Sequence, residues 1–91
     1  LYSFEDLKTV VSYSNDTKYG LAASYWGNNI ERIEFFLSNI NAGRIWINDT
    51  LKSYPVLPLG GLKESGLGKE GGYSGIKTYL TQKSVVYNFL A

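Results

Sequence analysis

Residues 21 to 48 of the chain are Leu21-Ala-Ala-Ser-Tyr-Trp-Gly-Asn-Asn-Ile-Glu-Arg-Ile-Glu-Phe-Phe-Leu-Ser-Asn-Ile-Asn-Ala-Gly-Arg-Ile-Trp-Ile-Asn48. The compact run 21–26 predicts a strand, and 44–48 predicts a second short strand. Between them, apolar side chains from Ile30 to Ile40 recur at helical spacing, with charged residues on the other side. A strand-helix-strand unit of this length typically makes a right-handed parallel crossover, so we expect the α/β class.

Asparagines and a glycine bound this predicted helix. Asn28 or Asn29 is expected to cap its N-terminus, because a short polar side chain can accept hydrogen bonds from the first free backbone N–H groups. Gly43 lies just beyond the apolar stripe, where a C-capping glycine is expected. These signals predict where the helix begins and ends.

Two further helices are predicted outside the strand-helix-strand unit. One runs from Phe4 to Ser14, where apolar side chains again recur at helical spacing. Ser3 followed by Asp6 resembles a capping box at its start. The other helix is short and lies near Ser74 to Leu80.

A last strand is predicted at Ser84-Val-Val-Tyr-Asn-Phe89, with no obvious place beside the two parallel strands. A strand with open edges seeks another sheet. Two interpretations stay open: the segment adds to a sheet of another domain or subunit, or it is an edge strand of this chain's own sheet.

Length and composition exclude several classes of function. The chain has 91 residues, enough for one domain at most, and its start at Leu1 without any Met predicts a piece of a longer protein. A net charge of +1 gives no electrostatic support for nucleic acid binding. No apolar stretch approaches the roughly 18 residues of a membrane span, and no targeting segment opens the chain. We therefore expect a cytoplasmic protein without a membrane partner.

The absence of cysteine and histidine limits the chemistry of this chain. It excludes thiolate or imidazole zinc sites, and it excludes any Ser-His or Cys-His catalytic pair made within these residues. If the protein is an enzyme, its central groups lie elsewhere.

The glycine-rich stretch from Pro58 to Gly72 holds six of the ten glycines of the chain. Such a density suits a main chain that takes left-handed turns or passes close to a ligand or another chain. Leucines and charged residues interleave with the glycines in a regular pattern, which favours an ordered loop over a flexible linker. We expect the function to lie in this loop.

Two nucleotide motifs fail within this loop. The run Gly66-Leu-Gly-Lys-Glu-Gly71 matches G-x-G-x-x-G, but Leu62 to Ser65 is not predicted to be the strand that this fingerprint needs. A P-loop needs Ser or Thr after the lysine, and Glu70 follows Lys69 instead. The loop is therefore not predicted to bind a nucleotide.

Two polar residues have both a functional and a structural interpretation. Glu70 is flanked by glycines, where its carboxylate could accept backbone N–H groups or bridge to a lysine in support of a site, or could simply be solvated. Asn48 ends a buried strand, the position from which α/β proteins present side chains to ligands. It could equally satisfy the first backbone groups of the next loop.

Three stretches in order resemble motifs of the aldehyde dehydrogenase superfamily: Asn15 to Ser24, Ala42 to Asn48, and Pro58 to Gly71. The resemblance is end to end. It implies that residues 1–81 are the C-terminal part of a catalytic domain. It also implies that residues 82–91 are an oligomerisation strand, commonly shared across subunits of a homo-oligomer.

The resemblance also implies NAD(P)-dependent oxidation of a small aldehyde to an acid. In the family a Cys thiolate attacks the carbonyl, hydride passes to the nicotinamide, and a Glu-activated water releases the acid. This chain holds none of those groups, so NAD or NADP would be bound by an upstream domain.

What the resemblance places here is the far wall of the substrate tunnel. Asn48 matches the end of the last catalytic-domain strand, and residues 49–57 match the loop that lines the entrance. Ser53 falls where semialdehyde-oxidising relatives bind the far carboxylate of the substrate, and Lys52 would also suit an anion. Leu59 replaces a family Phe, which removes an aromatic wall.

Further positions carry weaker implications. Glu70 matches a glutamate that lies in a proton path of some relatives, and Lys69 stands for a family Arg. Backbone carbonyls at Lys63 and Gly66 match those that hold a monovalent cation between subunits in some relatives. A different class of function also stays open: a non-catalytic interaction module that dimerises through residues 84–89.

Overall fold

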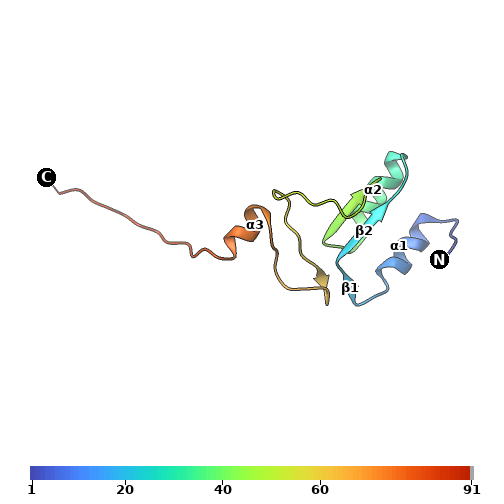
Figure 1. The fold of residues 1–91 in the computed structure, drawn as a ribbon, viewed down its shortest axis with the longest axis horizontal. Helices are drawn as coiled ribbons and strands as arrows, with labels where there is room; N and C mark the ends of the chain where they lie inside the picture. Colours follow the sequence, from blue (N-terminus) through green and yellow to red (C-terminus); the bar gives the residue numbers. More distant parts are fainter. Residues whose placement is uncertain (91) are drawn as a thin grey trace.

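The computed structural model describes residues 1–90. Its helices and strands, coloured along the chain in Figure 1, are α1 (Leu7–Asn15), β1 (Tyr19–Gly20), β2 (Ala22–Tyr25), α2 (Ile30–Asn39), β3 (Arg44–Ile47), β4 (Leu62–Lys63) and α3 (Gly72–Lys77).

The strands β2 and β3 form a parallel pair with α2 between them in the chain. The register runs from Ala22 opposite Arg44 to Tyr25 opposite Ile47, and the parallel direction is the one that the sequence predicts for these two strands. Asn29, the second of the two candidates, caps α2: its side chain accepts a hydrogen bond from the N–H of Arg32 at 2.9 Å.

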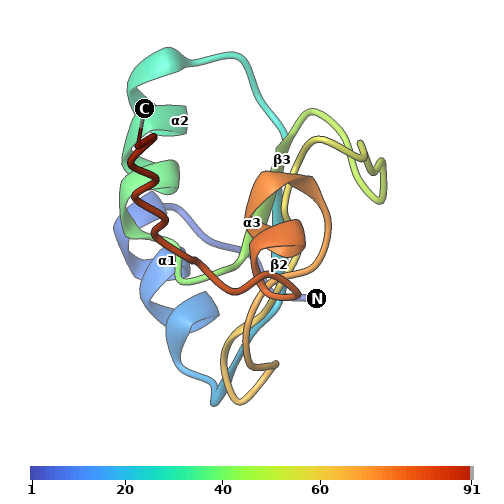
Figure 2. The same ribbon diagram turned by 90° about the vertical axis from the view of Figure 1, so that its left-hand side faces the viewer.

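Helices α1 and α2 pack together on one side of the β2–β3 pair, as Figure 2 shows. Val11 of α1 and Phe36 of α2 are the buried apolar residues of the described chain, and the Phe36 ring lies 5.3 Å from that of Tyr25. The side chain of Asn15 joins the helix ends: its Nδ2 donates to Asn39 O at 2.7 Å, and its Oδ1 accepts from Asn41 N at 2.8 Å. The core is therefore small.

Two predicted caps are wrong. Helix α1 begins at Leu7 and is capped by Asp6, whose side chain accepts from the N–H of Thr9, so Ser3 makes no capping box. Helix α2 ends at Asn39 with Ile40 as its C-cap, so Gly43 does not cap it. Gly43 is needed for a different reason: a Cβ there would overlap the carbonyl oxygen of Gly60.

The Asp6 cap makes the start of α1 sensitive to acid. Hydrogen bonds from Thr9, first from its hydroxyl and then from its backbone, lower the pKa of Asp6 below its usual 3.8. Because folding favours the carboxylate, this stabilisation is full above pH 3.8 and is lost as the pH falls through the lowered pKa. We expect carbon-13 NMR to give a pKa below 3.8 for Asp6 and Thr9→Ala to move it back towards 3.8. An Asp6 pKa that Thr9→Ala leaves unchanged would contradict this cause.

A second, antiparallel pair joins β1 to β4, with Tyr19 opposite Lys63 and Gly20 opposite Leu62. The prediction that Leu62 and Lys63 lie in no strand is therefore wrong. Both strands have two residues, too few for an alternating pattern to show in the sequence. This pairing brings the glycine-rich segment against the start of β2.

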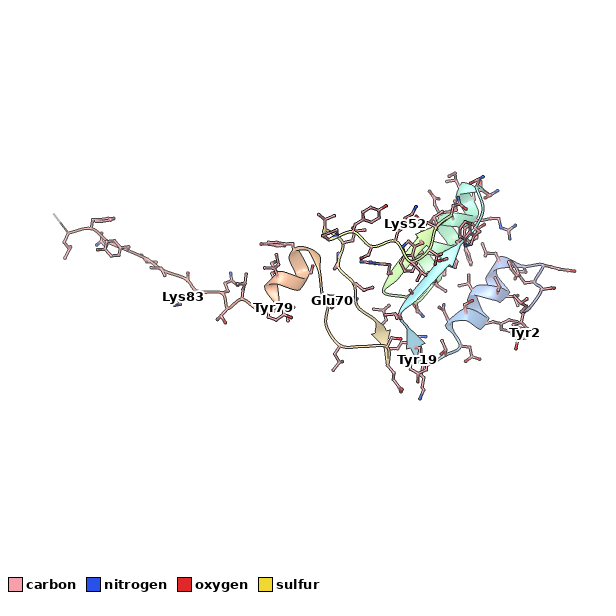
Figure 3. All side chains as sticks on the ribbon, in the orientation of Figure 1. Tyr2, Tyr19, Lys52, Glu70, Tyr79 and Lys83 are labelled. Atoms are coloured by element: carbon pink, nitrogen blue, oxygen red, sulfur yellow. The ribbon has the colours of Figure 1, made fainter. Side chains whose placement is uncertain are left out.

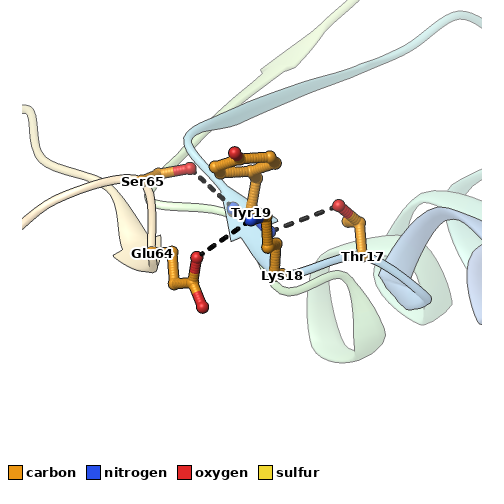
Figure 4. A network of polar contacts seen from close by, with 6 residues as sticks. Thr17, Lys18, Tyr19, Glu64 and Ser65 are labelled. Atoms are coloured by element: carbon orange, nitrogen blue, oxygen red, sulfur yellow. Dashed lines mark hydrogen bonds and ion pairs between the residues drawn. The ribbon is translucent and has the colours of Figure 1, made fainter.

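Polar contacts support this junction, shown in Figure 4. The N–H of Gly20 donates to Ser65 Oγ at 2.8 Å. Glu64 N also donates to Lys18 O at 2.9 Å. The side chains of Lys18 and Glu64 form an exposed ion pair at 3.4 Å. Exposed ion pairs add little, so the backbone bonds carry most of this contact.

In the described residues, an extended tail follows α3. Helix α3 covers Gly72–Lys77, earlier than the predicted Ser74 to Leu80. Residues 80–90 lie in no helix or strand and point away from the rest, as Figures 1 and 3 show for the segment around Lys83. The principal extents of 75 × 28 × 21 Å reflect this tail.

The interpretation of residues 84–89 as an edge strand of the chain's own sheet is wrong. Their backbone has no neighbouring strand within the described residues, so no ladder of hydrogen bonds can form. The other interpretation, addition to a different sheet, stays a prediction. No helix in residues 1–90 combines the length and the apolar character needed to cross a membrane.

Candidate functional site

Asn48 joins the ends of β2 and β3. Its Oδ1 accepts from Gly27 N at 2.7 Å, and its Nδ2 donates to Gly27 O and to Asn28 Oδ1, each at 3.0 Å. Its backbone is left-handed, with φ of 54°, a conformation that asparagine tolerates better than most residues. The described contacts of Asn48 thus serve the turn after β2.

Lys52 already has an acidic partner. Its Nζ lies 3.0 Å from Asp49 Oδ2, and this hydrogen bond raises the pKa of Lys52. The same bond, followed by one from the N–H of Thr50, lowers the pKa of Asp49. Both side chains stay charged near neutral pH, and the cation that was expected to attract an anion is partly neutralised.

Ser53 lies beside a buried arginine. Arg44, the first residue of β3, is only 8% exposed, and its Nη1 donates to Ser53 Oγ at 3.2 Å. Its Nη2 donates to the carbonyl oxygens of Leu57 at 3.1 Å and Pro58 at 3.0 Å. The guanidinium therefore connects the middle of the loop of residues 49–57, at Ser53, to its C-terminal end.

Leu59 and Glu70 lie opposite each other in the glycine-rich segment. Each N–H donates to the carbonyl of the other residue at 2.8 Å, and both residues line one groove of 420 Å³. Lys69 donates from Nζ to Gly60 O at 2.9 Å. The hydrogen bonds and lysine bridge expected for the Glu70 carboxylate are absent among residues 1–90.

The side chain of Lys63 is used within the chain. Its Nζ donates to Asn15 O at 2.8 Å and Thr17 O at 2.9 Å, which holds the end of α1. A cation site at the carbonyls of Lys63 and Gly66 stays a prediction. In the described part of the chain, no group of three acidic, His or Cys residues is placed to hold a metal ion.

The loop from Gly66 to Gly71 does not have the geometry of a dinucleotide site. The strand before it, β4, has two residues and pairs antiparallel with β1, and the helix after it, α3, has six. A dinucleotide fingerprint needs a parallel strand that runs straight into the first glycine and a full helix behind it. These residues therefore do not fit NAD or NADP.

The predicted site residues do not form one cluster in residues 1–90. Leu59 pairs with Glu70, whereas Lys52 lies on a separate segment, as the labels in Figure 3 show. Arg44 was predicted only as part of the strand 44–48, with no role of its own. A charged residue at the first position of an otherwise apolar strand was the signal that could have indicated it.

The chain matches the model of the Aldehyde dehydrogenase family over residues 1–85. It belongs to this family. It is 39% identical over 87 residues to "Omega-crystallin" of Enteroctopus dofleini, covering 96% of this chain and 18% of that protein. It is 42% identical over 81 residues to "Aspartate-semialdehyde dehydrogenase (Non-phosphorylating)" of Halomonas elongata, covering 89% of this chain and 16% of that one.

A solved structure gives the same result in three dimensions. The NAD-dependent aldehyde dehydrogenase from Sinorhizobium meliloti superposes with a TM-score of 0.83 at 41% identity, covering 86% of this chain and 16% of that one. The chain therefore spans less than a fifth of the length of these relatives. The mixed helix and strand arrangement is that of aldehyde dehydrogenase structures.

Proposed function

We propose that this chain is the C-terminal part of an enzyme that oxidises an aldehyde to a carboxylic acid with NAD or NADP. One observation carries the proposal: the family match extends over residues 1–85, while the chain covers only 16% to 18% of the length of its relatives. The remaining machinery would lie in a longer product.

The chemistry divides between this chain and the rest. Oxidation of an aldehyde needs a nucleophile, and a thiolate cannot come from a sequence without cysteine. When bound by an upstream domain, the nicotinamide supplies the hydride acceptor. The residues of this chain would shape the channel through which the aldehyde enters.

The wall of that channel would be the loop of residues 49–57, carried by β3. Arg44 donates to Ser53 Oγ, so the hydroxyl proton of Ser53 is left free to donate in turn. Such a donor suits the far carboxylate of a semialdehyde, and one relative is named for an aldehyde of this kind. With Leu59 in place of an aromatic residue, aliphatic aldehydes suit the wall better than aromatic ones.

Glu70 and the glycine-rich segment would support the site from behind. In this proposal Glu70 helps to move protons near the upstream glutamate that activates the water. The carbonyls of Lys63 and Gly66 hold a monovalent cation between subunits. The exposed tail would be the oligomerisation strand of a homo-oligomer. Its location in the cytoplasm stays a prediction.

The test is the natural product that carries this sequence. An immunoblot against residues 58–72 in a lysate of source cells should show a band several times longer than 91 residues. After purification, that product should reduce NAD or NADP only when an aldehyde is added. The 91-residue chain alone should give no reduction above a boiled control.

Substrate preference follows from the same assay. We expect succinate semialdehyde and butanal to be oxidised faster than benzaldehyde. Ser53→Ala should slow the oxidation of the semialdehyde more than that of butanal. Reduction of NAD or NADP by the 91-residue chain alone would contradict the division of chemistry described above.

A second candidate function has one observation in its favour. Most residues of the tail are apolar and exposed, as those of a dimerisation segment would be: Val85, Val86, Tyr87, Phe89 and Leu90. If the only natural product is as short as this chain, and it forms dimers, a non-catalytic interaction module replaces the enzyme proposal.

A further inference from the structure

Arg44 is a buried cation whose hydrogen bonds go to neutral oxygens. The acceptors are Ser53 Oγ and the carbonyls of Leu57 and Pro58. The ion pairs of residues 1–90 involve other lysines and acids, so no carboxylate of the described chain partners Arg44. A buried charge is costly unless it is well hydrogen-bonded. These bonds therefore fix the guanidinium and the loop oxygens relative to each other.

Trp46 donates a hydrogen bond to the same loop as Arg44. The two residues are two positions apart on β3, so their side chains leave the same face of the strand. The indole Nε1 of Trp46 donates to Lys52 O at 2.9 Å. Together, Arg44 and Trp46 hold the backbone of residues 52–58 near its start and at its end.

The loop of residues 49–57 has few other contacts that would fix its shape. Leu51 is 83% exposed and Val56 is 79% exposed, so its apolar side chains do not anchor it in a core. Leu51 also has a left-handed backbone, with φ of 60°, which a residue with a side chain keeps only when its surroundings impose it. From outside the loop, Gly72 N adds one bond to Pro55 O at 2.8 Å.

We propose that Arg44 is a positioning residue that sets the shape of the aldehyde entrance. Trp46 supports it by holding the backbone at Lys52. This inference rests on the proposed function, in which residues 49–57 line that entrance. The guanidinium acts through the loop and not on the reacting atoms. Lysine is a poor substitute, because an ammonium lacks the planar fork that reaches several acceptors at once.

The kinetic test uses the full-length enzyme with Arg44→Met, Arg44→Lys and the control Arg32→Met. Arg32 is an exposed arginine of α2, so the control makes the same chemical change away from the loop. For Arg44→Met, KM for hexanal should rise about tenfold, while KM for acetaldehyde, KM for NAD(P) and kcat stay within about twofold. Arg44→Lys should lie in between, and Arg32→Met should match the wild type.

Two kinetic outcomes would overturn the inference. Equal losses for hexanal and acetaldehyde, with KM for NAD(P) rising too, would mean general damage to the fold. Unchanged hexanal kinetics in a well-folded Arg44→Met enzyme would mean that the loop keeps its shape without the guanidinium. If Arg44→Met is insoluble, Trp46→Phe takes its place, since it removes only the indole N–H and should raise KM for hexanal in the same selective way.

A second measurement does not depend on activity. Trypsin cleaves after lysine, and the bond between Lys52 and Ser53 lies within the held segment. Limited digestion should cut this bond at least about fivefold faster in Arg44→Met and Trp46→Phe than in the wild type or Arg32→Met. Equal cleavage rates would overturn the inference. If the full-length protein oxidises no aldehyde but the cleavage rates differ, the proposed function fails while the hold of Arg44 on the loop stands.

Discussion

Replacing Gly43 with alanine in the full-length protein should loosen the glycine-rich segment from the β2–β3 pair. The added Cβ would overlap the carbonyl oxygen of Gly60 and lie 2.9 Å from its carbonyl carbon. Both atoms belong to the backbone, so neither can rotate away as a side chain could. We expect the free energy of unfolding to fall by about 3 kcal/mol, at the upper end of what overpacking usually costs.

The amides of Leu59 and Glu70 measure this loss directly, because each is hydrogen-bonded to the other residue. Hydrogen exchange at these two amides should become roughly a hundredfold faster in Gly43→Ala. The neighbouring hydrogen bonds explain why the backbone cannot easily shift to relieve the overlap of the added Cβ with Gly60. Gly43 N also donates to Gly20 O at 3.0 Å and Leu21 O at 3.1 Å, so its own backbone is fixed from the other side.

Gly68→Ala is the matched control for Gly43→Ala. Gly68 has φ of +71°, but no heavy atom lies within 4 Å of where its Cβ would be. The same change there should cost roughly 1 kcal/mol of backbone strain and leave the contact intact. If Gly43→Ala costs no more than Gly68→Ala, the close approach between residues 43 and 60 does not limit the fold.

Val86→Pro should dissociate the proposed homo-oligomer into smaller species. Val86 is 94% exposed and the tail has no strand partner within residues 1–90, so the change breaks no contact among the described residues. Proline removes a backbone N–H and cannot extend a ladder from a paired position. Size-exclusion chromatography with light scattering across a range of concentrations would give the mass before and after the change.

Val86→Thr serves as the control for this experiment. Threonine keeps the N–H and the branched side chain that strands favour, so the oligomer should persist. Persistence of the full mass in Val86→Pro would contradict pairing through the tail. Loss of the oligomer in both variants would indicate that side-chain packing holds the subunits and not a backbone ladder.

Local patterns in the sequence were enough for the central part of the fold. The apolar stripe of α2, its cap at Asn29 and the two strands beside it depend on neighbours within a few residues, which a sequence displays. The family resemblance rested on motifs of the same local kind. The match over residues 1–85 confirms it.

Contacts between distant residues were not predictable in this way. Strands β1 and β4 have two residues each and lie more than forty positions apart, so neither shows a pattern alone. Gly43 was predicted to be a helix cap from its place after the apolar stripe. Its close approach to Gly60 depends on a distant part of the chain, which no local pattern reveals. The hydrogen bonds of Arg44 likewise depend on where the chain returns after nine to fourteen residues.

The small core has a consequence for how a cell handles this sequence. Val11 and Phe36 are the only apolar residues buried among those described, while many large apolar side chains remain open to solvent. A stretch of this kind buries little apolar surface by itself, and exposed apolar surface is what chaperones and proteases recognise. Any shortened product that contained only this region would therefore be a substrate for quality control, and its lifetime would depend on the partners that cover it.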